Sequence, residues 1–131
     1  MATIKQFEDL EVWQQSMSLC TDIYKITNNE RFTKDYGLKD QIRRSAVSVP
    51  SNIAEGFERN GNKQFSYFLT IAKASCGEIR TQLTIAHNLN YLELYDFNLI
   101  LEKCINTSKQ IAGLIKYLNR LEDSKITRLE D

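Results

Sequence analysis

Apolar residues recur every three or four positions along most of this 131-residue chain, which is the spacing of one face of an α-helix. Polar residues of the kind that end helices interrupt this spacing between its long runs. We therefore expect helices over about 8–27, 38–59, 63–90 and 96–122. Four amphipathic helices with short connections predict a single all-α domain over residues 1–131, an antiparallel up-down four-helix bundle.

The expected core face of the first helix carries Leu10, Trp13, Met17, Cys20 and Tyr24. We interpret Trp13 as a packing residue because it lies in phase with this face.

The segments between and after the helices are predicted from their polar and small residues. Phe32 should anchor the first loop, and Gly37 should take a left-handed conformation before the second helix. Asn60 and Gly61 should end that helix, since both residue types tolerate the left-handed region. The tail over residues 123–131 is polar, and we expect it to be frayed.

The second helical segment contains Pro50, the one proline of the chain. A proline inside a helix removes a backbone hydrogen bond and costs about 3 kcal/mol. The apolar positions nevertheless continue through it in one phase: Leu38, Ile42, Ala46, Val49, Ile53 and Phe57. We therefore expect one bent helix. Small residues in this segment would let a neighbouring backbone approach closely: Ser45, Ala46, Ser48, Ser51, Ala54 and Gly56.

The same segment carries a longer motif. Residues 41–44 (Gln-Ile-Arg-Arg) and 48–56 (Ser-Val-Pro-Ser-Asn-Ile-Ala-Glu-Gly) resemble the signature of a bacterial four-helix-bundle family. That family includes the proteins encoded in intervening sequences of 23S rRNA genes, and it is similar to the accessory (variability determinant) proteins of diversity-generating retroelements. Residues 10–13, 36–38, 75, 78 and 81–83 extend the resemblance over nearly the whole chain. Lys39 and Ala74 depart from the Thr and Gly that are common in the family.

The resemblance implies a ring-shaped homo-oligomer, with a pentamer as the expected form. The similar retroelement proteins bind nucleic acid alongside a reverse transcriptase, so RNA or DNA and such a protein are the partners that the resemblance implies. In a ring, a weak basic patch on each protomer would be repeated, which raises the effective concentration of the contacts. For the intervening-sequence branch itself, the resemblance implies no biochemical role.

Composition adds constraints on location and partners. Seventeen basic and seventeen acidic residues balance, so a monomer would not steer nucleic acid by its net charge, and a polyanion site would have to be a local patch. No run approaches the roughly 18 apolar residues of a membrane span, and residues 1–9 lack the apolar run of a secretory signal. We expect a cytoplasmic protein without membrane contact.

The residues that carry chemistry are few. The one histidine, His87, has Thr84 three positions before it, so the Glu-x-x-His pairs of a di-iron bundle are absent. The three cysteines are far apart and are expected to be reduced core residues: Cys20, Cys76 and Cys104. No phosphate-binding glycine loop or nucleophile elbow is present. We therefore expect no catalytic residue, no metal and no cofactor, and hence no enzyme.

Basic residues supply the candidate binding site. Lys109, Lys116 and Arg120 fall on one face of the last helix, although Glu102 and Glu122 lie nearby, as on an ordinary solvated face. The candidate phosphate contacts are Arg43, Arg44, Arg59, Lys63, Lys116 and Arg120. The expected function is a non-catalytic homo-oligomeric scaffold that binds nucleic acid, as a ribonucleoprotein or retroelement-type accessory protein. The alternative is a purely protein-interaction oligomer.

A polar network between the helices is the second candidate feature. Its expected members are Gln41, Asn52, Glu55, Ser75 and Glu78, because a buried carboxylate must be paired. The two functions differ in what they require of the arginines. A phosphate site needs Arg43 or Arg44 exposed, whereas a structural role would bury them against Glu55 or Glu78.

Overall fold

The computed structural model describes the backbone of residues 3–130 and the side chains of residues 3–125. Over these residues the chain forms five α-helices and one 3₁₀-helix, with no β-strand, so the all-α class is confirmed. The elements are η1 (Phe7–Asp9), α1 (Glu11–Ile26), α2 (Glu30–Thr33), α3 (Tyr36–Glu58), α4 (Asn62–Asn88) and α5 (Leu94–Glu130).

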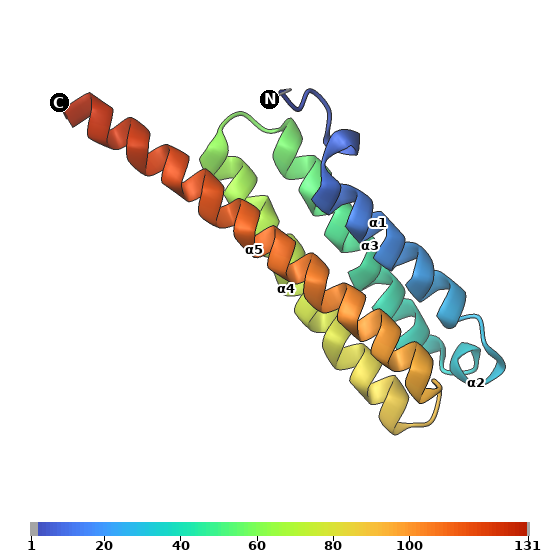
Figure 1. The fold of residues 1–131 in the computed structure, drawn as a ribbon. Helices are drawn as coiled ribbons and strands as arrows, with labels where there is room; N and C mark the ends of the chain where they lie inside the picture. The colour runs from blue at the N-terminus through green and yellow to red at the C-terminus, as the bar shows by residue number, and fades with distance from the viewer. Residues whose placement is uncertain (1–2, 131) are drawn as a thin grey trace.

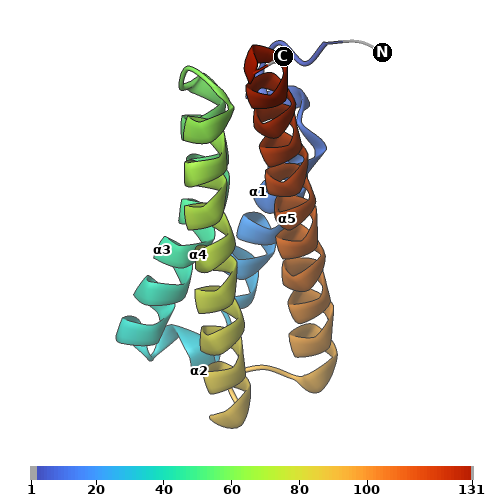
Figure 2. The same ribbon diagram turned by 90° about the vertical axis from the view of Figure 1, so that its left-hand side faces the viewer.

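The long helices enclose one hydrophobic core. α3 packs on α4, α4 packs on α5, and α1 packs on both α3 and α5. Figures 1 and 2 show these helices side by side, with the short α2 at the end where α1 leads into α3. Every α-helix contributes a fully buried side chain, among them Leu19, Phe32, Ile53, Leu83 and Ile111. None of the helices in the described part of the chain has the length and apolarity that crossing a membrane requires.

The predicted core face of α3 is confirmed. Ile42, Ala46, Val49 and Ile53 are at most 1% exposed, and the helix continues through the buried Pro50. α3 begins earlier than expected, at Tyr36, because the carboxylate of Asp35 accepts a hydrogen bond from the backbone N–H of Leu38 at 3.1 Å.

The prediction of a left-handed Gly37 is therefore wrong, since that residue lies in the first turn of α3. Positive φ angles occur instead at Gly61 (100°), as expected after the second helix, and at Asn90 (62°).

The predicted core face of α1 is confirmed in part: Leu10, Trp13 and Cys20 are partly buried against the core, but the centre of the buried face is displaced by about one position. Met17 and Tyr24 are 40% and 39% exposed, although they were expected in the core. The residues that are buried are Val12, Ser16, Leu19 and Ile23. The apolar spacing does not reveal this face, because the polar Ser16 occupies one of its buried positions. The Ser16 hydroxyl is satisfied there by donating a hydrogen bond to the carbonyl of Trp13 at 2.7 Å.

The last helix is longer than the sequence pattern indicates. α5 begins at Leu94 and continues to Glu130, whereas we expected a frayed tail after about residue 122; residue 131 lies outside the described part. The last buried side chain described in α5 is Leu118, and Figure 1 shows the following turns leading away from the other helices. No glycine or proline follows Gly113 in the sequence, so no residue there interrupts the helix.

Candidate nucleic-acid interface

Arg43 holds the C-terminal end of α1. Its guanidinium donates to Thr27 Oγ1 at 2.8 Å, to the carbonyl of Tyr24 at 3.1 Å and to Asn28 Oδ1 at 2.9 Å. It also lies 4.4 Å from the centre of the Tyr24 ring. The last carbonyls of a helix lack intrahelical partners, so a cation there satisfies them and complements the helix dipole. Arg43 is half-buried at this site, away from the carboxylates that we had considered as its partners.

Replacing Arg43 by alanine should therefore affect folding stability. We expect Arg43→Ala to lower the free energy of unfolding by about 1–2 kcal/mol, because three hydrogen bonds to a charged donor are lost at a partly exposed position. Arg44→Ala should change it by less than about 0.5 kcal/mol, since the ion pair of Arg44 is exposed. Urea denaturation followed by circular dichroism measures both values, and equal effects would contradict the capping role.

Two other candidate arginines are exposed but paired. Arg44 Nε lies 2.9 Å from Asp40 Oδ2, and the side chain is 80% exposed. Arg59 lies 2.6 Å from Glu55 Oε1, with both side chains about half exposed. A phosphate approaching either arginine would meet the neighbouring carboxylate, so these cations are poorer anion sites than unpaired ones. The i, i+4 spacing of both pairs is visible in the sequence.

Lys63, Lys116 and Arg120 lie together near one end of the molecule. Ser66 donates to Asn119 Oδ1 at 3.1 Å, which places the first turns of α4 beside the corresponding part of α5. Lys63 lies one turn before Ser66, and Lys116 and Arg120 flank Asn119. All three cations are exposed, and none forms an ion pair with another described residue.

Other cations extend this cluster along the line where α4 packs on α5. Cys104 Sγ donates to the carbonyl of Cys76 at 3.3 Å on that line. Lys73 and Arg80 lie three residues before and four residues after Cys76 on α4, on the same side of that helix, so both cations flank the line. Lys109 shares the exposed face of Lys116. We define the α4–α5 basic face as Lys63, Lys73, Arg80, Lys109, Lys116 and Arg120, all exposed and without an ion pair among the described residues.

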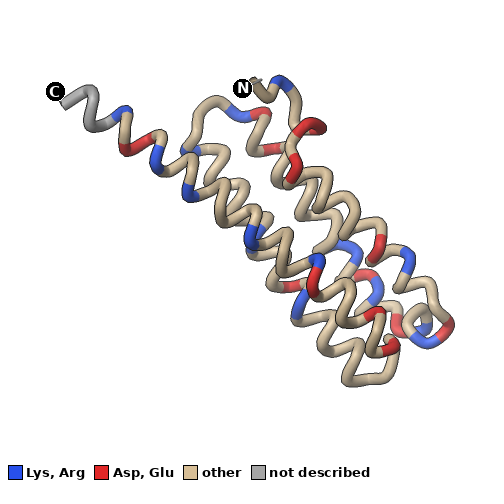
Figure 3. The backbone as a smooth tube through the Cα atoms, viewed as in Figure 1, with Lys and Arg blue, Asp and Glu red and all other residues tan. Residues whose placement is uncertain are grey.

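Acidic residues are sparse along this face. α4 has no Asp or Glu before Glu78, and α5 has none between Glu102 and Glu122. Figure 3 shows Lys and Arg positions spaced along α5, with the Asp and Glu positions of that helix toward its two ends. A chain of zero net charge thus carries a local cationic surface. Sequence reasoning missed Lys73 and Arg80, although the long acid-free stretches of α4 and α5 would have indicated them.

A polar network does join α3 to α4, with a membership different from the expected one. Ser75 donates to Ser48 Oγ at 2.8 Å, and Asn52 Nδ2 donates to the same oxygen at 2.9 Å. A second contact lies about one turn before Ser48 on α3 and two turns after Ser75 on α4: Gln82 Nε2 donates to Ser45 Oγ at 3.2 Å. Asn52 and Ser75 thus meet through Ser48, which we had noted as a small residue.

The other expected members lie outside this network. Glu55 pairs with Arg59 on the surface, and Gln41 and Glu78 are exposed beside a hollow between α3 and α4. The donors of Ser75, Asn52 and Gln82 find hydroxyl acceptors on α3, whereas the buried Oε1 of Gln82 has no hydrogen-bond partner in the described part of the chain. Neither Glu55 nor Glu78 belongs to a buried pair of carboxylates, the arrangement that acid–base catalysis uses.

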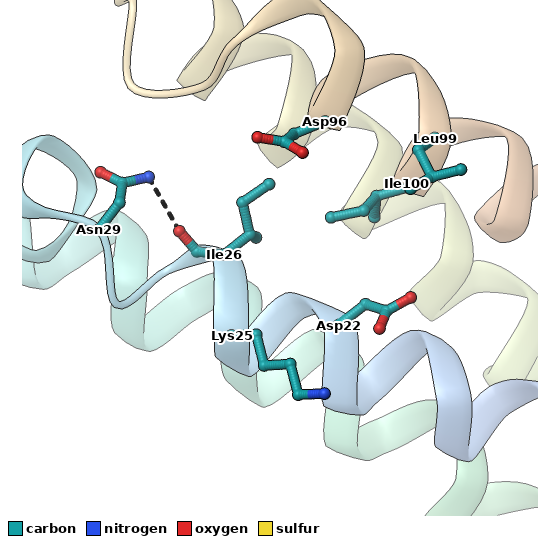
Figure 4. A pocket seen from close by; sticks show the side chains of 7 residues that line it. All are labelled: Asp22, Lys25, Ile26, Asn29, Asp96, Leu99 and Ile100. Carbon is teal, nitrogen blue, oxygen red and sulfur yellow. Dashed lines mark hydrogen bonds between the residues drawn. The ribbon is translucent and has the colours of Figure 1, made fainter.

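A surface hollow of about 370 Å³ lies between α1 and α5 (Figure 4). Its polar groups are already engaged in part: Asp22 pairs with Lys103, and Asn29 donates to the carbonyls of Ile26 and Tyr91 at 2.9 Å each. Apolar side chains form the rest of the wall, including Ile26, Leu99 and Ile100. Among the described residues no group of three or more His, Cys, Asp or Glu could hold a metal ion.

The cysteines are core residues rather than reactive ones. Cys76 and Cys104 are fully buried, Cys20 is half-buried, and all three are free thiols. The hydrogen bond with Cys76 and burial raise the pKa of Cys104 far above its ordinary value, so Cys104 stays a neutral thiol at pH 7. A thiolate is the form that acts as nucleophile or metal ligand. As a buried neutral thiol, Cys104 therefore contributes packing.

These observations define the class of protein: an all-helical protein whose candidate site is an exposed cationic helix face. The chain belongs to the family of 23S rRNA-intervening sequence proteins, whose family model matches residues 8–113. The match confirms the family suggested by the motif in α3.

A solved structure supports the same assignment. The chain is similar to a crystal structure, at 1.70 Å resolution, of a protein of unknown function from the S23 ribosomal protein family of Bacteroides thetaiotaomicron. The TM-score is 0.74 at 25% identity, and the match covers 80% of this chain and 98% of that one. No curated protein sequence matches the chain.

Proposed function

We propose that this protein is a non-catalytic, homo-oligomeric scaffold that binds nucleic acid through phosphate contacts on the α4–α5 basic face. The observation that carries the proposal is the exposure of six cations that have no ion-pair partner among the described residues. Unpaired surface cations keep their full attraction for phosphate, and counterion release makes such contacts favourable. Contacts to phosphates position a strand without reading its sequence.

The proposal includes an antiparallel up-down four-helix bundle as the architecture of each protomer. The cyclic order of helix contacts, α1 with α3, α3 with α4, α4 with α5 and α5 with α1, supports it. In this arrangement α4 and α5 are neighbours along their length, so their cations form one continuous surface. The hydrogen bond between Ser66 and Asn119 supports this alignment at one end of the face.

A second copy of the chain is the proposed first partner, with a pentameric ring as the form that the family resemblance implies. A ring would repeat the basic face around an axis, and several weak contacts to one strand would act together. A ribonucleoprotein or retroelement-type accessory role is the setting that we propose.

Fluorescence anisotropy with mixed-sequence RNA and single-stranded DNA, over a salt series, tests the phosphate contacts. We expect binding that weakens with salt with a log–log slope of about −0.7 per neutralised phosphate. In the triple variant Lys63→Ala/Lys116→Ala/Arg120→Ala the slope should become shallower by about 2 units per protomer engaged, because three contacts are lost. The oligomeric state is measured on the same samples by light scattering.

A matched control removes three exposed cations from other parts of the molecule. Lys5, Lys25 and Lys34 are exposed and have no ion pair among the described residues, so Lys5→Ala/Lys25→Ala/Lys34→Ala changes the net charge by the same amount. This variant should keep the wild-type slope. If the intact oligomer binds no nucleic acid at low salt, the proposal fails, and a protein-interaction oligomer becomes the better description.

A further inference from the structure

We propose that the nucleic acid held by the α4–α5 basic face is single-stranded, and that unpaired bases stack on the rings of Tyr67 and Tyr117. The inference rests on the proposed function and names the class of strand that it selects. Its basis is the presence of two exposed aromatic rings among the cations at one end of the face.

Both rings are unusually open to solvent. Tyr67 is 62% exposed and Tyr117 is 56% exposed, although a tyrosine ring gains free energy when it is removed from water. Each ring shares a side of its helix with a cation of the basic face: Tyr67 follows Lys63 by four residues, and Tyr117 precedes Arg120 by three. The Ser66–Asn119 hydrogen bond places the two rings at the same level of the molecule. A strand whose phosphates contact Lys63 and Arg120 would therefore bring its bases within reach of a ring.

A contact with Phe68 restricts the orientation of the Tyr67 ring before any ligand arrives. Its ring packs against Phe68 with the centroids 5.2 Å apart and the planes at 84°. The guanidinium of Arg59 lies 5.1 Å from the Phe68 centroid and is paired with Glu55. An edge-to-face contact leaves at least one face of the Tyr67 ring uncovered. A ring that is already oriented loses less conformational entropy on binding.

This arrangement discriminates between paired and unpaired strands. In a duplex the bases are stacked within the helix, and only phosphates, sugars and base edges are available to a flat surface. In a single strand every base offers a free π-face, so stacking on an aromatic side chain adds affinity without a sequence requirement. The lysines attract both forms, and the tyrosines favour the single strand.

The test compares a labelled single-stranded RNA with a duplex of the same length by fluorescence anisotropy. We expect the wild-type protein to prefer the single strand, and Tyr67→Ala/Tyr117→Ala to weaken single-strand binding about tenfold or more. The salt slope should stay unchanged because no charge is removed. The variant Tyr67→Phe/Tyr117→Phe should keep the affinity, since stacking needs the ring and not the hydroxyl.

Two other exposed tyrosines provide the control. Tyr36 is 80% exposed at the start of α3 and Tyr95 is 75% exposed near the start of α5, away from the Ser66–Asn119 contact. Tyr36→Ala/Tyr95→Ala should bind like the wild type. All variants are checked by thermal unfolding, so that a loss of folding is separated from a loss of binding.

The outcomes separate the inference from the function on which it rests. If neither single strand nor duplex binds, the proposed function fails. If both bind equally, or if the alanine and phenylalanine variants behave alike, nucleic-acid binding stands and the stacking inference is overturned.

Discussion

Replacing Phe32 by alanine is expected to lower the free energy of unfolding by about 3–5 kcal/mol, the usual range for removing a fully buried aromatic ring. Phe32 is completely buried although it belongs to a helix of four residues, and its ring lies 5.5 Å from that of Tyr91. Asn29 links the same two segments, since it accepts a hydrogen bond from the Phe32 N–H at 2.8 Å and donates one to the carbonyl of Tyr91. The ring thus joins α2 to the connection between α4 and α5.

Arg31→Ala is the control for Phe32→Ala, because Arg31 lies in the same short helix and pairs with Glu93 on the surface. An exposed ion pair contributes little, so this variant should change the free energy of unfolding by less than about 0.5 kcal/mol. Chemical denaturation in urea measures both. A loss of less than about 1 kcal/mol in Phe32→Ala would mean that α2 is not an integral part of the core.

Replacing Gly56 by valine should be the second severe change, with an expected loss of about 3 kcal/mol. A Cβ atom at Gly56 would lie 2.8 Å from Phe68 Cβ, 3.0 Å from Phe65 Cδ1 and 3.2 Å from the Phe65 carbonyl oxygen. Two of these neighbours are backbone or backbone-adjacent atoms of α4, so side-chain rotation cannot relieve the contact. Either α3 and α4 separate locally or the valine is strained.

Gly77→Ala is the matched control in α4, because a Cβ atom there would meet nothing within 4 Å. Alanine is a better helix former than glycine, so this variant should gain about 0.5–1 kcal/mol. Thermal and urea unfolding of both variants give the comparison. Opposite signs are expected, and a neutral Gly56→Val would show that the α3–α4 approach is looser than the structure indicates.

The comparison of predicted and observed helices shows what periodicity can reveal. α3 was correct in its core positions because apolar residues occupy nearly every one of them, even around Pro50. α1 was displaced because Ser16 is polar at a buried position while Met17 and Tyr24 are apolar at exposed ones. Periodicity reports the average character of a helix face. When a helix carries apolar residues on two faces, periodicity does not show which of them is buried.

Some features of the candidate interface could likewise be predicted from the sequence, and others could not. Two of the paired arginines could have been recognised from the sequence, since Asp40 and Glu55 stand four residues before Arg44 and Arg59. The role of Arg43 could not, because its partners lie at the end of α1 and just after it, 15 to 19 residues away along the chain. The neighbourhood of Lys63 and Arg120 depends on contacts between α4 and α5 that periodicity within one helix does not contain.

The sequence by itself determined the helical class, the approximate helix limits, the core face of α3 and the family motif, because these depend on residue types within a few turns of one another. The tertiary structure alone decided which cations remain unpaired, which small residues form the α3–α4 network and which tyrosines stay exposed near cations. The physical reason is that the neighbours in space of a charge, a hydroxyl or a ring either pair with it or cover it, or leave it exposed to solvent. Those neighbours are set by helix packing, which joins residues far apart in the chain.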